Sequence, residues 1–460
     1  MRKIQSAAQW AQVEFGDAEL GDARRTARAV QMAEALAQSP GGALPGALPS
    51  WAELKAGYRL LENEAVTHAA LQRPHWQQTR QACQARGEYL LLEDTTSLDF
   101  TEHWATEGLG RIGDDRGRGF FVHTTLALRI ERWVTREPVV SVQGLFGQQV
   151  WARAEKLDPK REKKAARLSR PRESQRWAAV LDQAGDAPPG TSWTLVADRE
   201  GDIAEVFLRV RQHAADFIIR ACQPRAVELE EDDLFSAAAR APLKGEFAIE
   251  LRARPGQAAR TATVEVRARE VRVRGPWRPE GKLPAQSVNV IEIKERQAPA
   301  GVEPLRWVLL TSWPCETLEQ CLKVARAYSA RWLVEEYHKA LKSGTGVEES
   351  QLTTALRLEA LLGILALVAV RLLELKLQAR VAPDQAVPAA TLGAEAFAVL
   401  EAKHGRPKEG WTNRAVLVGI AKLGGFLARR GDGDPGWLTI WRGWQRLVLL
   451  TEGYSLRREW

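Results

Sequence analysis

Hydrophobic residues recur at helical spacing through the first part of the chain, up to about residue 68. A glycine- and proline-rich stretch at residues 39–46 interrupts this pattern and predicts a loop between two helical segments. Ser50 and Glu53 have the spacing of a capping box, which predicts the start of the next helix. We therefore expect residues 1–68 to form a helical N-terminal domain.

From residue 69 to residue 376, short apolar runs alternate with helical patterns, which is typical of a domain that combines a sheet with helices. Two of the runs, ending at Asp94 and Asp198, predict buried strands with a carboxylate at the end of each. Strands are expected at residues 89–93, 119–128, 139–145, 193–197 and 217–220, and a helix at 203–213.

The interval between Asp198 and Glu335 is too long for one connection within a compact fold. Polar and apolar residues alternate through much of it, as in strands that are buried on one face only. We expect an inserted, largely antiparallel β-subdomain at about residues 225–312. Residues 156–176 are strongly charged and lack apolar periodicity, so they predict a surface loop that can touch DNA.

The last part of the chain, residues 377–460, begins with a proline- and alanine-rich stretch and continues with helical patterns. Trp437, Trp441 and Trp444 recur at i, i+4 and i+7, so they share one helix face. Such a face is usually buried against neighbouring helices. We expect a helical C-terminal domain in which some of these tryptophans lie at an interface.

A third carboxylate, Glu335, lies in a predicted helix. At about 100° per residue, Tyr328, Arg331, Glu335, Lys339 and Lys342 would fall within roughly 80° of one helix face. Oxygen ligands of this kind bind hard cations, and a pair of Mg²⁺ ions can clamp the attacking and leaving oxygens of a phosphodiester. An ordinary solvated face with an Arg331–Glu335 pair explains the same pattern, and the residues alone leave both interpretations open.

Composition and residue spacing limit the classes of protein to which this chain can belong. The 65 basic and 58 acidic residues give a net charge of +7, which permits nucleic-acid binding without requiring it. The four cysteines and seven histidines lack the spacings of a thiolate zinc site, a disulfide framework or a zincin. The longest apolar run, residues 360–370, is shorter than a membrane span, and no signal peptide begins the sequence. We expect a cytoplasmic protein.

Several motifs resemble those of one family of bacterial enzymes. The segment from Ala330 to Gly344 resembles the Y-R-E-K signature of cut-and-paste transposases of the insertion-sequence-four family, transposon-five transposase type. Residues 93–98 (EDTTSL) and 198–203 (DREGDI) resemble the two aspartate motifs of that family, in the same order. Residues 20–28, 304–312 and 421–426 extend the likeness over nearly the whole chain.

The resemblance implies an α/β fold: an RNase H-like catalytic core with the inserted β-subdomain, between a DNA-end-binding N-terminal domain and a C-terminal dimerisation domain. It implies a DNA transposase that hydrolyses transposon ends, forms and resolves a hairpin, and transfers the strand into target DNA. Asp94, Asp198 and Glu335 would bind two Mg²⁺ ions, for which Mn²⁺ substitutes. The partners would be double-stranded DNA, namely inverted-repeat ends and target, and a second copy of the chain, with the active protein at the nucleoid.

The same family assigns roles to further residues. Trp307 would stack on a base extruded near the hairpin. Phosphates would be held by Tyr328, Arg331, Lys339 and Lys342. Partial matches to the family make Arg118 and Arg220 weaker candidates for DNA contacts. Arg24, Arg25 and Arg28 are candidates because they lie close together on one flank of a predicted helix. Two other acids are expected to be structural, since strand alternation turns Glu93 away from Asp94 and Asp202 lies beyond the strand end.

Three alternatives compete with a transposase. A metal-dependent nuclease on the same core would need the acids but neither the Y-R-E-K face nor a stacking tryptophan. A DNA-binding derivative of a transposase would not need the acids. A retaining glycosidase also uses two carboxylates, but it would have an aromatic sugar cleft and no basic helix face.

Overall fold

The computed structural model describes most of the chain. The described residues are 6–48, 50–114, 116–134, 137–153, 172–228, 233–251, 259–279, 281–388 and 391–458. Most of the charged segment 156–176 lies outside them, so its predicted contact with DNA stays a prediction.

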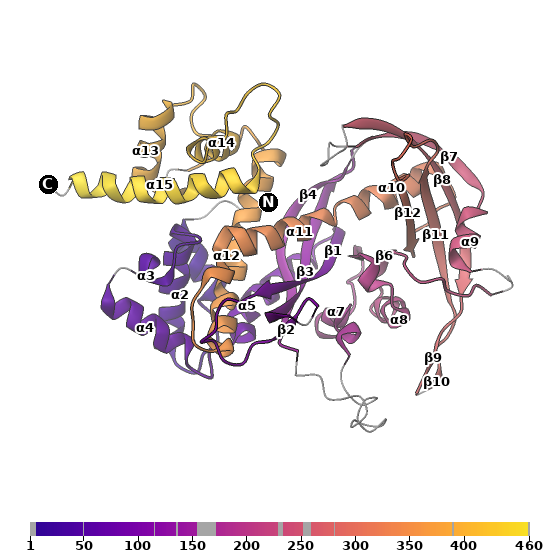
Figure 1. Ribbon diagram of the computed structural model, residues 1–460, viewed down its shortest axis with the longest axis horizontal. Coiled ribbons are helices and arrows are strands. Elements are labelled where there is room, and N and C mark those ends of the chain that lie inside the picture. Colours follow the sequence, from indigo (N-terminus) through magenta and orange to yellow (C-terminus); the bar gives the residue numbers. More distant parts are fainter. Residues whose placement is uncertain are drawn as a thin grey trace.

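Helices form the N-terminal part (Figure 1). Polar side chains cap the first turns of several of them. Ser6 and Gln9 form a capping box, and Asp22 accepts from the Arg24 amide at the next helix start. Ser50 accepts from the Glu53 amide at the helix start expected from the sequence, and its hydroxyl donates to the Glu53 carboxylate. The helices are α1 (Ala7–Phe15), α2 (Ala23–Gln38), α3 (Leu44–Ala47), α4 (Trp51–Leu61) and α5 (His68–Ala82).

A ten-stranded mixed sheet forms the centre of the molecule (Figure 1). Its order is β2-β3-β1-β5-β6-β12-β11-β8-β7, with β4 paired to β3, and β1, β5 and β6 run parallel. The first strands are β1 (Gly87–Asp99), β2 (Gly110–Ile112), β3 (Gly117–Arg132), β4 (Val139–Trp151), β5 (Thr191–Ala197) and β6 (Asp216–Arg220). The later ones are β7 (Leu243–Leu251), β8 (Arg260–Val273), β11 (Gln286–Glu295) and β12 (Arg306–Thr311), and β9 (Trp277–Arg278) and β10 (Gly281–Lys282) form a separate hairpin.

One prediction about β1 is wrong: the strand does not end at Asp94. Its parallel pairing with β5 stops at Glu93, but its antiparallel pairing with β3 continues to Asp99. The apolar run of β1 stops where its pairing with β5 ends, because beyond that point β1 has no neighbouring strand on that side among the described residues. Asp94 therefore lies at the edge of the parallel part of the sheet, inside a longer strand.

The strands predicted between residues 225 and 312 are antiparallel, as expected, and they extend the central sheet. β12 pairs with β6 through Leu309 and Arg220, and β11 and β8 follow in order. The insertion therefore shares hydrogen bonds with the core sheet.

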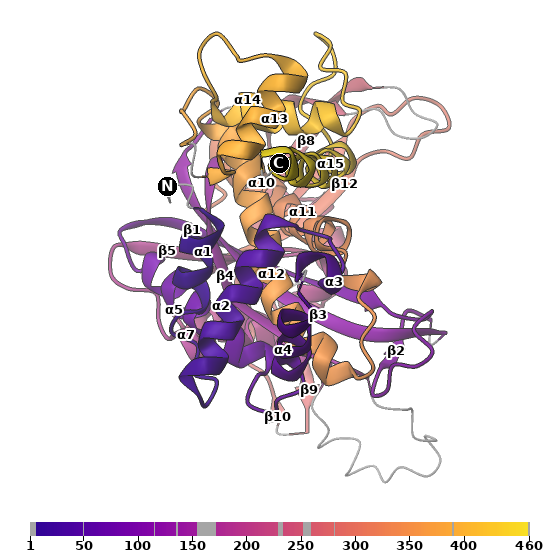
Figure 2. The same ribbon diagram turned by 90° about the vertical axis from the view of Figure 1, so that its left-hand side faces the viewer.

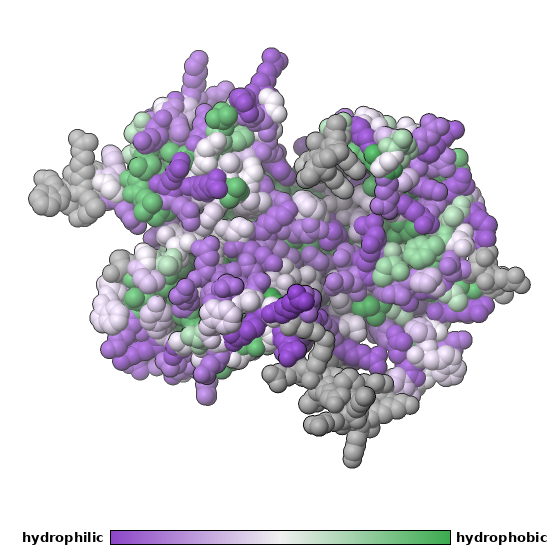
Figure 3. All heavy atoms as spheres, in the orientation of Figure 1, coloured by the Kyte–Doolittle hydropathy of each residue, from purple (hydrophilic) through white to green (hydrophobic). Residues whose placement is uncertain are grey.

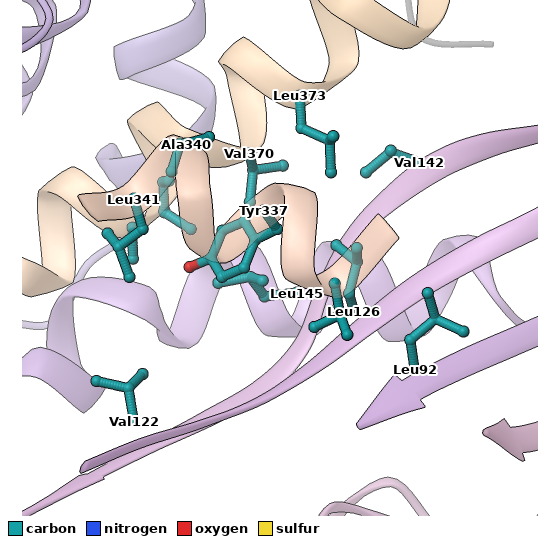
Figure 4. Packing of buried hydrophobic residues seen from close by; sticks show 14 of the residues in the cluster. Leu92, Val122, Leu126, Val142, Leu145, Tyr337, Ala340, Leu341, Val370 and Leu373 are labelled. Carbon is teal, nitrogen blue, oxygen red and sulfur yellow. The ribbon is translucent and has the colours of Figure 1, made fainter. Parts of the chain in front are cut away.

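The two faces of the sheet are covered by different helices. Leu90 and Leu92 of β1 belong to one buried cluster, whereas Tyr89 and Leu91 belong to the other, as the alternation of a strand requires. Figure 4 shows the first cluster, in which Tyr337 packs among the leucines of the sheet. The helices that contribute to this first cluster include α10 (Leu318–Ser329), α11 (Trp332–Lys339), a π-turn (Ala340–Gly344) and α12 (Ala355–Val381). The second face carries α7 (Ala179–Ala184), α8 (Ala204–Gln212) and α9 (Leu234–Ala239), and short 3₁₀ turns occur at Glu173–Arg176, Arg199–Gly201 and Val347–Glu349.

The long helix α12 leads from the core into the C-terminal part, where α13 (Ala394–His404), α14 (Asn413–Leu423) and α15 (Trp437–Arg458) follow. The domain boundary expected at residue 376 falls inside α12, so the two parts share a continuous helix. In Figure 2 the C-terminal helices lie above the N-terminal ones. Within the described residues, no helix is both long and apolar enough to cross a membrane.

The three tryptophans of α15 pack inward. Trp444 is buried in the C-terminal core, and Trp437 and Trp441 are half-buried against the main cluster. Trp441 lies directly on Gly41, where a Cβ atom would meet its ring. This stripe therefore joins the C-terminal helices to the rest of the chain.

Candidate active site

Asp94 and Asp198 come together because their strands are parallel neighbours. Glu93 is level with Ala197, so each aspartate is the next residue after the last paired position. Asp198 caps the 3₁₀ turn Arg199–Gly201, and its carboxylate accepts a hydrogen bond of 2.8 Å from the backbone amide of Glu200. The two carboxylates are thus held at the same edge of the parallel strands.

The electrostatics of this edge favour a bound cation. Burial raises the pKa of Asp198, the negative charge of Asp94 adds to that, and the Glu200 amide, Arg331 and Arg220 oppose it. The pKa of Glu200 is raised too, first by burial and then by Asp198 and Asp94. The repulsion between these like charges is relieved when a metal ion neutralises them.

The third acid comes from a helix that is interrupted, which corrects the expected geometry. α10 ends at Ser329 and α11 begins at Trp332, so Tyr328 and Glu335 do not lie on one continuous α-helix. The turn between them still brings the groups together. Arg331 Nη2 donates to Glu335 Oε1 at 2.5 Å, and the Arg331 guanidinium lies 5.9 Å from the centre of the Tyr328 ring.

The donor set of this site fits a hard divalent cation. Asp94, Asp198 and Glu335 offer only carboxylate oxygens, the ligands that Mg²⁺ prefers. Among the described residues, no three histidine, cysteine or acidic side chains already form a cluster tight enough for one ion. Glu335 is paired with Arg331 instead, so binding by all three acids requires this pair to loosen.

The acids expected to be structural have structural partners. Glu93 is fully buried and accepts from the Ala178 amide and the Thr125 hydroxyl, on the sheet face away from α11. Asp202 is buried and accepts from the amides of Cys222 and Gln223 at 2.7 and 2.9 Å. Each carboxylate therefore ties together segments of the fold.

Trp307 and two lysines surround the helical part of the site. Trp307 is half-buried, and its ring meets Tyr328 edge-on at 5.8 Å. Lys339 lies 4.1 Å from the centre of the exposed Trp332 ring, and Lys342 Nζ is 3.9 Å from a Glu348 oxygen. These cations and rings can contact a nucleic-acid strand that approaches the acids.

The remaining arginine predictions differ in their surroundings. Arg220 lies close enough to lower the pKa of Asp198, whereas Arg118 donates to the Thr106 carbonyl at 2.8 Å. Near the start of α2, Arg24 is exposed and paired with Asp22, and Arg25 donates to the Leu20 carbonyl. Arg28, also on α2, is half-buried, and no hydrogen bond or ion pair ties its side chain to the described residues. Their contacts with DNA stay predictions.

Sequence reasoning passed over two residues at the site. Glu200 follows Asp198 by two positions, and its pKa is raised by burial and by the negative charges of Asp198 and Asp94. His338 follows Glu335 by one helical turn, and its Nδ1 lies 3.5 Å from Asp94 Oδ2. The i+3 spacing from Glu335 was the available signal for His338.

Three family models match the chain. A transposase DNA-binding domain matches residues 7–66, a transposase DDE domain matches residues 168–371, and a transposase Tn5 dimerisation domain matches residues 370–460. Asp198 and Glu335 lie within the second match, and Asp94 precedes it.

Proposed function

The chain belongs to the DDE transposases of the Tn5 type, metal-dependent enzymes that cleave DNA and transfer strands, and on this premise we propose that it performs cut-and-paste transposition through a hairpin. In this scheme water cuts one strand at the transposon end, and the freed 3′-hydroxyl attacks the opposite strand. A second water opens the resulting hairpin, and the 3′-hydroxyl then attacks target DNA. The site that does this is the edge of the RNase H-like core where Asp94 and Asp198 meet α11.

We assign the metal ligands to Asp94, Asp198 and Glu335. Two Mg²⁺ ions, or Mn²⁺ in their place, would polarise the scissile phosphate and lower the pKa of the attacking water. The observation that supports this assignment is the pairing of Asp94 and Asp198 at the edge of parallel strands, where burial and the charge of Asp94 raise the pKa of Asp198. Arg331 is suited to exchange its contact with Glu335 for one with a phosphate, because guanidinium binds both anions with the same fork.

Trp307 is proposed to stack on the base that the tight hairpin forces out of the helix. Its ring is held edge-on by Tyr328, which leaves a ring face for a base, and Tyr328 adjoins Arg331. Tyr328, Arg331, Lys339, Lys342 and Arg220 would hold the phosphates of the bent strand beside the acids. Arg118 would add a more distant contact.

DNA ends and a second protomer complete the proposed complex. The N-terminal helices would bind the inverted repeat, with Arg24, Arg25 and Arg28 on its phosphates. The C-terminal part would pair two protomers. Figure 3 shows hydrophobic side chains gathered on the outer side of this part, at the upper left, and Leu438 and Leu449 of α15 are 56% and 66% exposed. The proposed place of action is the nucleoid, in the cytoplasm.

A single assay tests the proposal. The protein and Mg²⁺ are incubated with a labelled duplex that carries the element's own end, and a denaturing gel separates nick, hairpin and double-strand break. A hairpin that forms and then resolves is the expected result. Nicks without a hairpin would indicate a nuclease, and a bound but uncut duplex would indicate a DNA-binding derivative.

Variants then test the residues. Asp94→Asn, Asp198→Asn and Glu335→Gln should each lower cleavage by at least about a thousandfold, because several kcal/mol of metal-dependent stabilisation are lost, with DNA binding retained in a gel shift. Cleavage that survives in one variant removes that residue from the site. Trp307→Ala should slow hairpin formation more than the first nick, and equal loss of both steps would contradict the stacking role.

A further inference from the structure

A chain of hydrogen bonds between buried side chains runs from helix α5 to His338, which lies beside Asp94. His338 of α11 lies between Asp94 and Thr124, with Nδ1 3.5 Å from Asp94 Oδ2 and Nε2 3.3 Å from Thr124 Oγ1. Gln148 of β4 continues the chain, since its amide nitrogen donates to the same Thr124 hydroxyl at 2.9 Å. Gln72 of α5 donates to the Gln148 carbonyl oxygen at 3.1 Å. His338, Thr124, Gln148 and Gln72 are all buried.

The orientations of the two glutamine amides are fixed at the far end from Asp94. The indole nitrogen of Trp76 can only donate, and it donates to the Gln72 carbonyl oxygen at 3.0 Å. The Gln72 amide nitrogen therefore faces the Gln148 oxygen, and the Gln148 nitrogen faces Thr124. His68 Nε2 lies 2.9 Å from the same Gln148 oxygen, where it must donate, and this agrees with that orientation.

Thr124 links the Gln148 amide to the His338 imidazole. Because the Thr124 hydroxyl accepts from Gln148, its own proton is available for His338 Nε2. The Asp94 carboxylate can only accept, so a neutral His338 ring satisfies both neighbours when Nδ1 carries the proton and Nε2 accepts from Thr124. Reversal of the Gln72 or the Gln148 amide would set a buried donor against a donor or an acceptor against an acceptor.

We propose that this chain positions Asp94: it holds His338 as the Nδ1–H tautomer, which donates to Asp94 Oδ2 and leaves Oδ1 directed to a metal ion. His338 is a positioning residue in this account, and Gln148 and Trp76 act through it. The inference rests on the proposed role of Asp94 as a metal ligand. Partners that orient metal-binding carboxylates and histidines commonly change metal affinity by about 10- to 100-fold.

The tautomer can be read without activity. The full-length, metal-free protein is labelled with ¹⁵N-histidine, and two-bond ¹H–¹⁵N correlations recorded at pH 8 show which of the two ring nitrogens carries a proton. The His338 signals are assigned by their loss in His338→Asn. A protonated Nδ1 and an unprotonated Nε2 are expected, and a proton on Nε2 would overturn the proposal.

A second variant tests the far end of the chain. Trp76→Phe removes the indole donor but keeps an aromatic ring, so the Gln72 and Gln148 amides become free to turn. Mixed tautomers at His338 are expected in this variant. An unchanged spectrum would show that Trp76 does not set the direction.

Conservative replacements of His338 separate positioning from packing. Asparagine places a donor near the position of Nδ1, whereas glutamine places it near Nε2. Mn²⁺ affinity, measured by electron paramagnetic resonance with the metal alone, should fall about tenfold or more in His338→Gln and His338→Ala but stay within about threefold in His338→Asn. Equal affinities in all three, with equal melting temperatures, would overturn the positioning role.

The same titration on Asp94→Asn separates this inference from the proposed function. If Asp94→Asn binds Mn²⁺ and cleaves DNA like the wild type, the metal-ligand assignment fails whatever tautomer His338 adopts. If Asp94→Asn loses both while His338→Gln loses neither, the assignment stands and the positioning chain fails.

Discussion

The same residue type has different roles in this chain, according to what its carboxylate meets. Glu93 and Asp94 are neighbours on β1, yet Glu93 accepts from a buried amide and Asp94 stands near Asp198. Glu335 and Glu336 are neighbours on α11, yet Glu336 is bound by Lys376 and the Trp437 indole. An acid satisfied by fixed donors stabilises the fold, whereas an acid beside another acid is available to a cation.

Asp198→Asn should stabilise the metal-free protein while it abolishes cleavage. The raised pKa of Asp198 means that its charged form is disfavoured in the folded state, first by burial and then by Asp94. For an acid with a raised pKa, the favourable contribution is present below the usual value of 3.8 and is lost as pH rises through the folded-state pKa. The variant should therefore melt roughly 2 °C above the wild type at pH 7.

The comparison is made by melting both proteins over a range of pH without metal. The two curves should converge as pH falls below 3.8, where the wild-type carboxyl becomes protonated in the folded and unfolded chains alike. A wild type that is more stable than the variant at pH 7 would contradict the unfavourable placement of the Asp198 charge.

At the scale of elements, two glycines let the C-terminal helices approach closely. A Cβ atom on Gly443 of α15 would lie 1.8 Å from the Ile420 carbonyl oxygen of α14, and one on Gly424 would lie 1.9 Å from the Thr439 carbonyl oxygen. Backbone atoms cannot move aside as a flexible side chain can. The packing of α14 on α15 therefore depends on the absence of side chains at both positions.

Gly443→Ala should lower the free energy of unfolding by about 1–3 kcal/mol, because the added methyl forces the two helices apart. Gly453→Ala is the matched control, since it lies on the same helix with nothing within 4 Å of the added atom. The control should gain up to about 1 kcal/mol from helix propensity. Denaturant unfolding measures both, and equal effects would rule out the close contact.

Glu336 links three helices, and its replacement should loosen them. Burial raises its pKa, but Lys376 of α12 and the Trp437 indole of α15 outweigh that effect and bring the pKa below 4.5. Glu336→Gln leaves the buried Lys376 without its charged partner and should cost about 1–3 kcal/mol in unfolding free energy. Glu409→Gln, at an exposed position, should change stability by less than about 0.5 kcal/mol.

The pH dependence of this effect has the opposite sign to that at Asp198. An acid with a lowered pKa stabilises the fold above its usual pKa, and the contribution is lost as pH falls through the folded-state value. The difference between wild type and Glu336→Gln should therefore be full at pH 7 and shrink below pH 4.5. A difference that persists at lower pH would point to packing instead of charge.

At the scale of the whole molecule, the proposed pairing of protomers should depend on α15. Leu449→Glu places a charge on the exposed apolar side of this helix and should weaken the paired protein–DNA complex by at least about tenfold. Leu427→Glu is the control, because Leu427 is also 66% exposed but lies outside α15. Sedimentation gives the mass of each complex on an end-bearing duplex. Equal masses for both variants at all concentrations would exclude this side of α15 as the contact.

Local patterns were enough to predict the two strands that lead to Asp94 and Asp198. β1 and β5 carry continuous apolar runs, because both faces of the sheet are covered where these strands pair. The continuation of β1 to Asp99 depends on its pairing with β3, and the apolar run alone does not indicate it. The break between α10 and α11 is also absent from the pattern, since a periodic spacing does not register a two-residue turn.

The sequence by itself determined the residue types and their local order: apolar runs ending in carboxylates, and an acid among basic and aromatic residues. Only the tertiary structure decided what those groups meet. The addition of the inserted strands to the central sheet, the bond between Glu336 and α15, and the chain of hydrogen bonds from Trp76 to His338 all join residues far apart in sequence. Local spacing carries no information about such contacts, because they form only when distant segments pack together.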